Sequence, residues 1–159
     1  MHFPAGPSTR LIPEMNFVCS GTIVGYTAAL LGPPGHQGPI IQVWRKYTTY
    51  YKTSVDIAIN NSSCDGGLTI IGGVFHCSLN LTTTRVTVEP GDILGLELPV
   101  EQGLAFARVS SGPTNYMFNT GKRSLISMSS SAFSRYYLTG LLPQINLKVG
   151  TGKCISSLW

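Results

Sequence analysis

Residues 51–60, YKTSVDIAIN, alternate strictly between two kinds of side chain over ten positions. One face is expected to carry Tyr51, Thr53, Val55, Ile57 and Ile59, and the other the polar or small residues between them. A period of two is typical of an antiparallel β-strand with one buried face. A helix would place Val55 and Ile57 about 200° apart and would destroy this face. The stretch therefore predicts a half-buried strand.

Short apolar, β-branched segments recur on both sides of this strand, with Gly and Pro at the joints. Strands are expected at residues 15–19, 22–31, 40–45, 68–71, 74–79, 83–88, 93–98, 104–109, 116–119, 124–128, 136–138 and 145–149. Gly72-Gly73 is expected to form a bend or bulge. This spacing is typical of an antiparallel sandwich or barrel. We predict an all-β protein with an antiparallel, jelly-roll-like β-sandwich at residues 11–149, a flexible N-terminus at 1–10 and a C-terminal tail at 150–159.

The stretch VTVEPGDILGLELP, residues 86–99, contains two of these strands and the connection between them. Pro90 presets φ and Gly91 accepts a positive φ, as the centre of a type II turn requires. We expect Asp92 to accept hydrogen bonds from turn amides rather than to act as a catalyst. Asp65, which precedes two glycines, is also interpreted as a turn residue rather than a calcium ligand.

The composition favours an extracellular β-rich protein. Charged residues make up 11 % of the 159 positions, well below the roughly 25 % of typical soluble domains, and Ser and Thr take their place. The formal net charge is +4, but the basic residues are scattered, whereas a nucleic-acid surface needs a cluster or stripe. No apolar run reaches the roughly 18 residues that span a bilayer. We therefore expect no nucleic-acid partner and no membrane insertion by this chain.

Four cysteines at wide spacing, with no C-x-x-C, indicate disulfides rather than a zinc or redox site. Of the three possible pairings we prefer Cys64–Cys77, which encloses a short loop, together with Cys19–Cys154, which joins the two ends. Cys64, His76 and Cys77 make a poor zinc site because neighbours on a strand point to opposite faces. We predict no metal and no cofactor.

Three asparagines, Asn60, Asn61 and Asn80, begin N-x-[ST] sequons in or beside polar loops. We expect them to carry N-linked glycans. The first ten residues lack the basic segment followed by an apolar segment of a signal peptide. We therefore expect a mature or truncated piece of a longer extracellular protein; the alternative is an intracellular protein with free cysteines.

Aromatic and basic residues gather between residues 44 and 52. Tyrosines beside cations can stack on sugar rings or form a hot spot for protein contact, whereas Trp44 and Tyr51 are expected in the core. Residues 31–39, 45–51 and 110–123 are the predicted contact loops. The predicted ligand-binding residues are Tyr47, Tyr50, Lys52, Arg45 and His36.

Catalytic signatures are absent from the sequence. There is no H-E-x-x-H, no G-x-S-x-G, no P-loop and no dinucleotide-binding glycine pattern. A glycosidase needs two facing carboxylates, for which Glu89, Asp92, Glu97 and Glu101 are candidates by proximity alone. We predict a non-catalytic recognition or adhesion module, with a lectin-like carbohydrate-binding module and a glycoside hydrolase as the two alternatives.

Three motifs carry a resemblance to a known group of domains. They are Phe17-x-Cys19-x-Gly21-x-Ile23-x-Gly25-Tyr26, Ile41-Gln42-Val43-Trp44-Arg45 and Val88-x-Pro90-Gly91-Asp92-Ile93-Leu94-Gly95. On these motifs the chain resembles an uncharacterised extracellular β-rich domain of secreted and cell-surface proteins of sponges and other early-branching animals. The similarity covers residues from about 11 to 98 and again 142–149. It implies an extracellular location and a type of module, and no particular chemistry. From the sequence as a whole we expect a protein or glycan partner at the cell surface.

Overall fold

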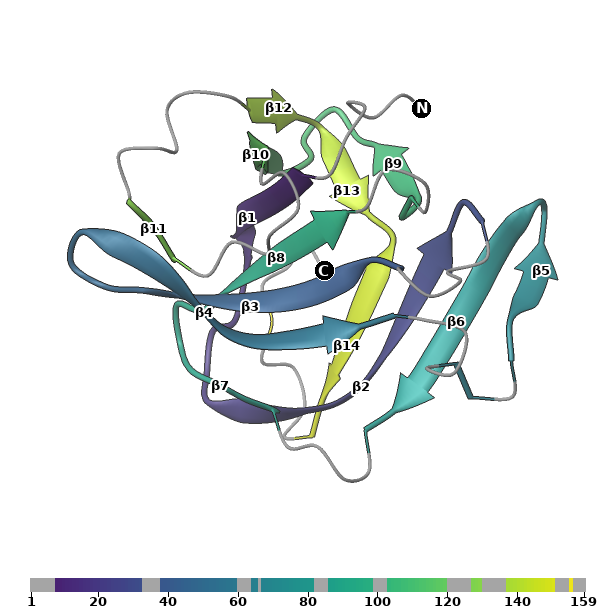
Figure 1. Ribbon diagram of the computed structural model, residues 1–159, viewed down its shortest axis with the longest axis horizontal. Helices are drawn as coiled ribbons and strands as arrows, with labels where there is room; N and C mark the ends of the chain where they lie inside the picture. The colour runs from purple at the N-terminus through teal and green to yellow at the C-terminus, as the bar shows by residue number, and fades with distance from the viewer. Residues whose placement is uncertain are drawn as a thin grey trace.

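The architecture is an antiparallel β-sandwich, as predicted (Figure 1). The computed structural model describes residues 8–32, 38–59, 64–65, 67–81, 86–98, 103–119, 127–129, 137–150 and 155. Within these residues every named element is a strand, and every strand pairing is antiparallel. Sheets pack on one another across a common apolar core.

The larger sheet has seven strands in the order β11-β4-β3-β8-β1-β10-β12. Their bounds are β11 Ser127–Ser129, β4 Tyr50–Ala58, β3 Ile40–Lys46, β8 Ile93–Leu98, β1 Ser8–Asn16, β10 Thr114–Asn119 and β12 Tyr137–Thr139. Strands that are distant in sequence, such as β3 and β8, are neighbours in the centre of this sheet.

The second sheet has five strands, with β14-β2-β6-β5 in order and β7 paired to β2. Their bounds are β14 Ile145–Val149, β2 Gly21–Leu30, β6 Val74–Asn80, β5 Thr69–Ile71 and β7 Val86–Val88. A separate pair is formed by β9 (Phe106–Arg108) and β13 (Leu141–Pro143).

The core lies between the inner faces of the two large sheets. In the seven-stranded sheet, Ile12, Leu94 and Val43 stand side by side on three adjacent strands and are fully buried. The second sheet contributes Ile23 and Tyr26 from β2, which are also fully buried. Burying a side chain of this size stabilises a fold by roughly 1.5–3 kcal/mol, so this contact layer holds the sheets together.

The alternation predicted for residues 51–60 changes phase within β4. After the pair Val43–Val55 the next pair is Trp44–Thr53, so one residue of β4 has no partner on β3. Such a β-bulge shifts all later residues to the other face. The prediction of one continuous face is therefore wrong. After the bulge, the predicted apolar face points into the core. Before the bulge, it points to the opposite side of the sheet, the side that carries Trp44.

Gly72-Gly73 forms a tight hairpin turn between β5 and β6, and the expected bend or bulge is wrong. Ile71 and Val74 are paired directly across the two glycines. Gly72 and Gly73 have φ values of 60° and 80°, and two successive positive φ values are those of a type I′ turn.

The N-terminal strand begins at Ser8, three residues before the predicted domain boundary at Leu11. Thr9 and Arg10 are fully buried, so the predicted flexible N-terminus at residues 1–10 is wrong for these two residues. The Arg10 guanidinium carbon lies 4.8 Å from the ring centre of Phe106, a distance at which a cation–π contact is favourable.

Cys64 and Cys77 form a disulfide, which confirms the preferred pairing. The bond ties the residues before β5 to the middle of β6. Cys19 is also disulfide-bonded, and Cys154, its predicted partner, lies outside the described residues. Ile155 forms an isolated bridge with Phe17.

Trp44 packs directly against the backbone of β8. Its indole is fully buried and donates its N–H to Gln42 Oε1 at 3.0 Å. A Cβ added at Gly95 would lie 2.4 Å from Cδ1 and Nε1 of this indole. Only glycine therefore fits at residue 95 while Trp44 keeps its position.

Replacing Gly95→Ala is expected to lower the free energy of unfolding by about 1–3 kcal/mol, because the new methyl group overlaps the indole. Urea denaturation followed by circular dichroism measures the change. In a Trp44→Leu background the same substitution should cost less, and equal costs in both backgrounds would contradict a direct contact.

Replacing Cys64→Ala and Cys77→Ala together is expected to lower the free energy of unfolding by about 3 kcal/mol, since the bond closes a short loop. Denaturation of the double variant without a reducing agent measures the effect of this bond alone, because the disulfide of Cys19 stays intact. A change near zero would contradict a stabilising role.

Candidate functional site

The connection between β3 and β4 carries two exposed tyrosines close together. It consists of Tyr47-Thr48-Thr49-Tyr50, all exposed, which we call the aromatic tip. The Tyr47 amide donates to the Tyr50 carbonyl at 2.7 Å. In Figure 1 this hairpin projects at the left end of the long axis of the molecule.

The two tyrosine rings of the tip are stacked on each other. Their centres are 4.9 Å apart and their planes differ by 13°. Tyr47 and Tyr50 remain 42 % and 39 % exposed, so they contact one another and solvent rather than the core. Stacking fixes both rings in one orientation and lowers the entropy they would lose on binding.

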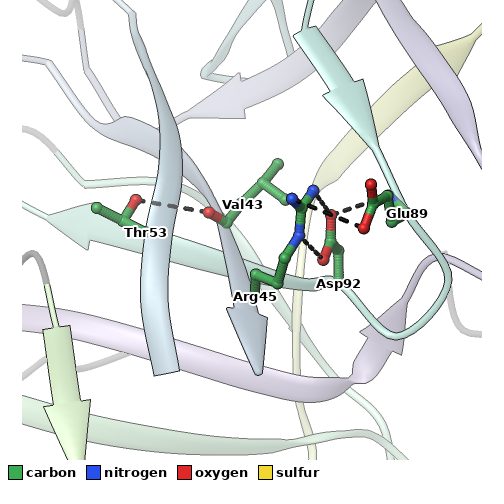
Figure 2. Close-up of polar contacts among 5 residues, drawn as sticks. All are labelled: Val43, Arg45, Thr53, Glu89 and Asp92. Atoms are coloured by element: carbon green, nitrogen blue, oxygen red, sulfur yellow. Dashed lines mark hydrogen bonds and ion pairs between the residues drawn. The ribbon is translucent and has the colours of Figure 1, made fainter. Parts of the chain in front are cut away.

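Arg45, one position before the end of β3, anchors the hairpin to the turn before β8 (Figure 2). Its Nε and NH2 groups donate to the two carboxylate oxygens of Asp92 at 3.0 and 2.9 Å. Asp92 is 1 % exposed, whereas the Arg45 side chain is 30 % exposed. Bidentate pairs of this kind are strong and fix geometry, so the base of the hairpin is held in one place.

The turn that carries Asp92 has the predicted form. Gly91 has a φ of 91°, and the Asp92 amide donates to the Glu89 carbonyl at 3.0 Å, as in a type II turn. Asp92 Oδ2 accepts the Glu89 amide at 2.9 Å. The prediction that Asp92 satisfies a turn amide is confirmed, and its pairing with Arg45 is an addition that the sequence did not reveal.

The Asp92 carboxylate raises the pKa of the Arg45 guanidinium, chiefly through their hydrogen bonds and against the effect of desolvation. Glu89 Oε2 lies 3.7 Å from Arg45 NH1 and adds a weaker attraction. Arg45 therefore keeps its charge and stays paired, and its role here is structural.

A polar chain on the Trp44 face supports the hairpin next to this pair. Gln42 accepts the Trp44 N–H and donates through Nε2 to Asp56 Oδ1 at 3.1 Å. Thr53 Oγ1 lies 3.4 Å from the same Asp56 oxygen and 3.5 Å from the Val43 carbonyl (Figure 2). These bonds connect β3 to β4 across the bulge.

The remaining predicted site residues do not gather in one place. Lys52 is exposed on β4, and Asn80 is exposed at the end of β6; the Asn80 amide donates to Asp65 Oδ2 at 2.9 Å. His36, Asn60 and Asn61 lie outside the described residues, as does the part of the predicted 110–123 loop beyond residue 119.

Several carboxylates of the described residues are engaged in hydrogen bonds within the fold. They are Glu14, which accepts the Thr114 amide, and Asp56, Asp65 and Asp92. In the described part of the chain, no three or more His, Cys, Asp or Glu side chains form a group that could hold a metal ion. No helix there is long and apolar enough to cross a membrane.

Comparisons of the chain with protein families, with curated proteins and with solved structures gave no match. The geometry of the molecule is therefore the basis for assigning a role to the aromatic tip.

Replacing Asp92→Asn is expected to lower the free energy of unfolding by about 2 kcal/mol, because Arg45 loses its charged, buried partner. Thermal and urea denaturation measure the loss. The matched variant Glu89→Gln should cost less than about 1 kcal/mol, since that carboxylate is exposed and makes only the longer contact with Arg45, at 3.7 Å. Equal costs for the two substitutions would contradict the special role of Asp92.

Proposed function

We propose that this protein is an extracellular recognition module that binds a protein partner through the aromatic tip. The stacked, exposed pair Tyr47 and Tyr50 carries this proposal. Tyrosine is enriched at the energetic centres of protein interfaces, because it offers a large rigid surface and a polar hydroxyl.

The orientation of the rings favours a protein partner over a glycan. Each ring of a stacked pair covers one face of the other, and the two uncovered faces point in opposite directions. A sugar-binding platform instead needs ring faces exposed on one common surface. We therefore expect the pair to meet its partner with ring edges and hydroxyls, which suit insertion into a pocket of a protein surface.

Charges beside the tip indicate the kind of protein surface. Lys46 and Lys52 flank it in sequence, and both are exposed. The carboxylates of Asp92 and Glu89 form ion pairs with Arg45 at the base of the hairpin. The end of the molecule thus carries positive charge around an aromatic centre, and an acidic partner surface would complement it and speed association.

The non-catalytic character of the proposal rests on the carboxylates. Asp92 contacts Arg45 and the Glu89 amide with its two oxygens and is 1 % exposed, so it does not reach a substrate. Glu14 likewise accepts a hydrogen bond from the fold, from the Thr114 amide, and Oε2 of Glu97 is buried. A hydrolase needs a pair of accessible carboxylates.

The extracellular location is supported by the disulfides. Cys64 is bonded to Cys77, and Cys19 is also oxidised. Such bonds form and persist in oxidising compartments and are rare in the cytosol.

Binding of the labelled protein to intact animal cells tests the proposal. Tyr47→Ala with Tyr50→Ala should weaken binding at least about 30-fold, the effect of losing a hot spot of roughly 2 kcal/mol. Tyr137→Ala is the matched control, because Tyr137 is another exposed tyrosine, on β12, and should leave binding unchanged.

Pretreatment of the cells separates the two classes of partner. Trypsin should abolish binding, whereas enzymatic removal of surface glycans should not. Binding that survives trypsin but is lost on glycan removal would support the lectin-like alternative instead.

A further inference from the structure

The free edge of the five-stranded sheet is apolar and exposed. Among the described strands, β5 pairs only with β6 and ends the sheet. Ile70 and Ile71 are 62 % and 63 % exposed, more than any other large apolar side chain among the described residues. In Figure 1 this edge lies at the right, at the other end of the long axis from the aromatic tip.

This edge lacks the usual features that prevent strands from associating. Natural proteins protect edge strands with charged residues, proline or a bulge. Residues 66–84 contain no Lys, Arg, Asp, Glu or Pro, and the pairing of β5 with β6 is regular. The chain carries a net charge of +4, yet the β5–β6 hairpin itself brings no Lys, Arg, Asp or Glu side chain to this edge.

The backbone of β5 is also oriented for pairing. In a hairpin with a two-residue turn, the residues on each side of the turn face each other as a hydrogen-bonded pair. Ile71 and Val74 are that pair here. Because backbone groups alternate in direction along a strand, Ile70 points its N–H and C=O away from β6, toward the free edge.

We propose that two copies of this chain form a symmetric dimer by antiparallel pairing of β5 with β5, centred on Ile70. In that register Ile70 exchanges both backbone hydrogen bonds with its own copy, and each Thr69 faces the other chain's Ile71. The contact is self-complementary, as a twofold axis requires, and it joins the two sheets into one.

The side chains favour this register. Leu30, Phe75 and Ile70 are neighbours across β2, β6 and β5, so they lie in one row on one face of the sheet. The row starts in the core, where Leu30 is 1 % exposed, and ends at exposed Ile70. Pairing about Ile70 continues this apolar row into the second copy and covers the exposed isoleucine.

The dimer would have a geometric consequence for binding. The aromatic tip and β5 lie at opposite ends of the molecule (Figure 1), so two tips would project from the far ends of one particle. Such a particle can join two partners or bind a clustered surface with higher avidity. The dimer itself does not depend on the proposed role of the tip.

Sedimentation velocity of the full, oxidised chain between about 1 μM and about 1 mM tests the dimer. The natural protein should shift from monomer to dimer in this range. Ile70→Lys and Ile70→Glu should each raise the dissociation constant at least about tenfold, because like charges would face each other across the axis. An equimolar mixture of the two variants should recover a dimer, since opposite charges then meet.

Val18→Lys is the matched control, because it adds the same charge at another exposed apolar position, 56 % exposed and outside β5; it should associate like the natural protein. A natural protein that stays monomeric throughout the range would overturn the proposal, as would a dimer unchanged by Ile70→Lys. A third outcome would also overturn the dimer: the natural protein stays monomeric but co-sediments with phosphatidylcholine vesicles, and the Ile70→Lys variant no longer does. That result would assign the edge to lipid binding.

Discussion

The close contact between Trp44 and Gly95 is the constraint on which the architecture depends. It allows β3 and β8, which are distant in sequence, to pair while a large indole lies flat on the backbone between them. The opposite face of the same two strands then remains available for Val43 and Leu94 to fill the core. Since interiors are close-packed, a single methyl group at residue 95 would disturb both layers. One glycine thus permits both a packed core and an aromatic layer on the other face.

The polar contacts next to this seam explain why the aromatic tip can be exposed and yet fixed. Arg45 and Asp92 join the two strands just beyond Trp44, and Gln42 joins Trp44 to Asp56 on the neighbouring strand. The hairpin therefore leaves the sheet from a base held on two sides. A preorganised binding element loses less entropy when it meets a partner. By holding the hairpin in place, the contacts of Arg45 would contribute to the proposed recognition.

Features set by a few neighbouring residues could be predicted from the sequence, and features set by long-range pairing could not. The turn at Pro90-Gly91 follows from the φ preferences of two residues, and the Cys64–Cys77 bond from a short spacing. The bulge in β4 arises from its fit to β3, so regular alternation in YKTSVDIAIN gave no sign of it. Arg10 fell in the predicted flexible N-terminus because its sequence neighbours do not reveal its contact with Phe106. The stacking of Tyr47 on Tyr50 likewise required the hairpin to be known.

The Cys64–Cys77 bond also determines how the module would behave under tension. Force that reaches the chain on both sides of this bond, at points between Cys19 and Cys154, would pass through the bond, whose Cα atoms are 5.0 Å apart, and would bypass the residues inside the loop. These residues would contribute roughly 40 Å of extended chain if released. The β5–β6 hairpin lies largely inside that loop and is therefore shielded from pulling. The proposed dimer contact through this sheet edge would stay assembled while the rest of the sandwich yields to mechanical load.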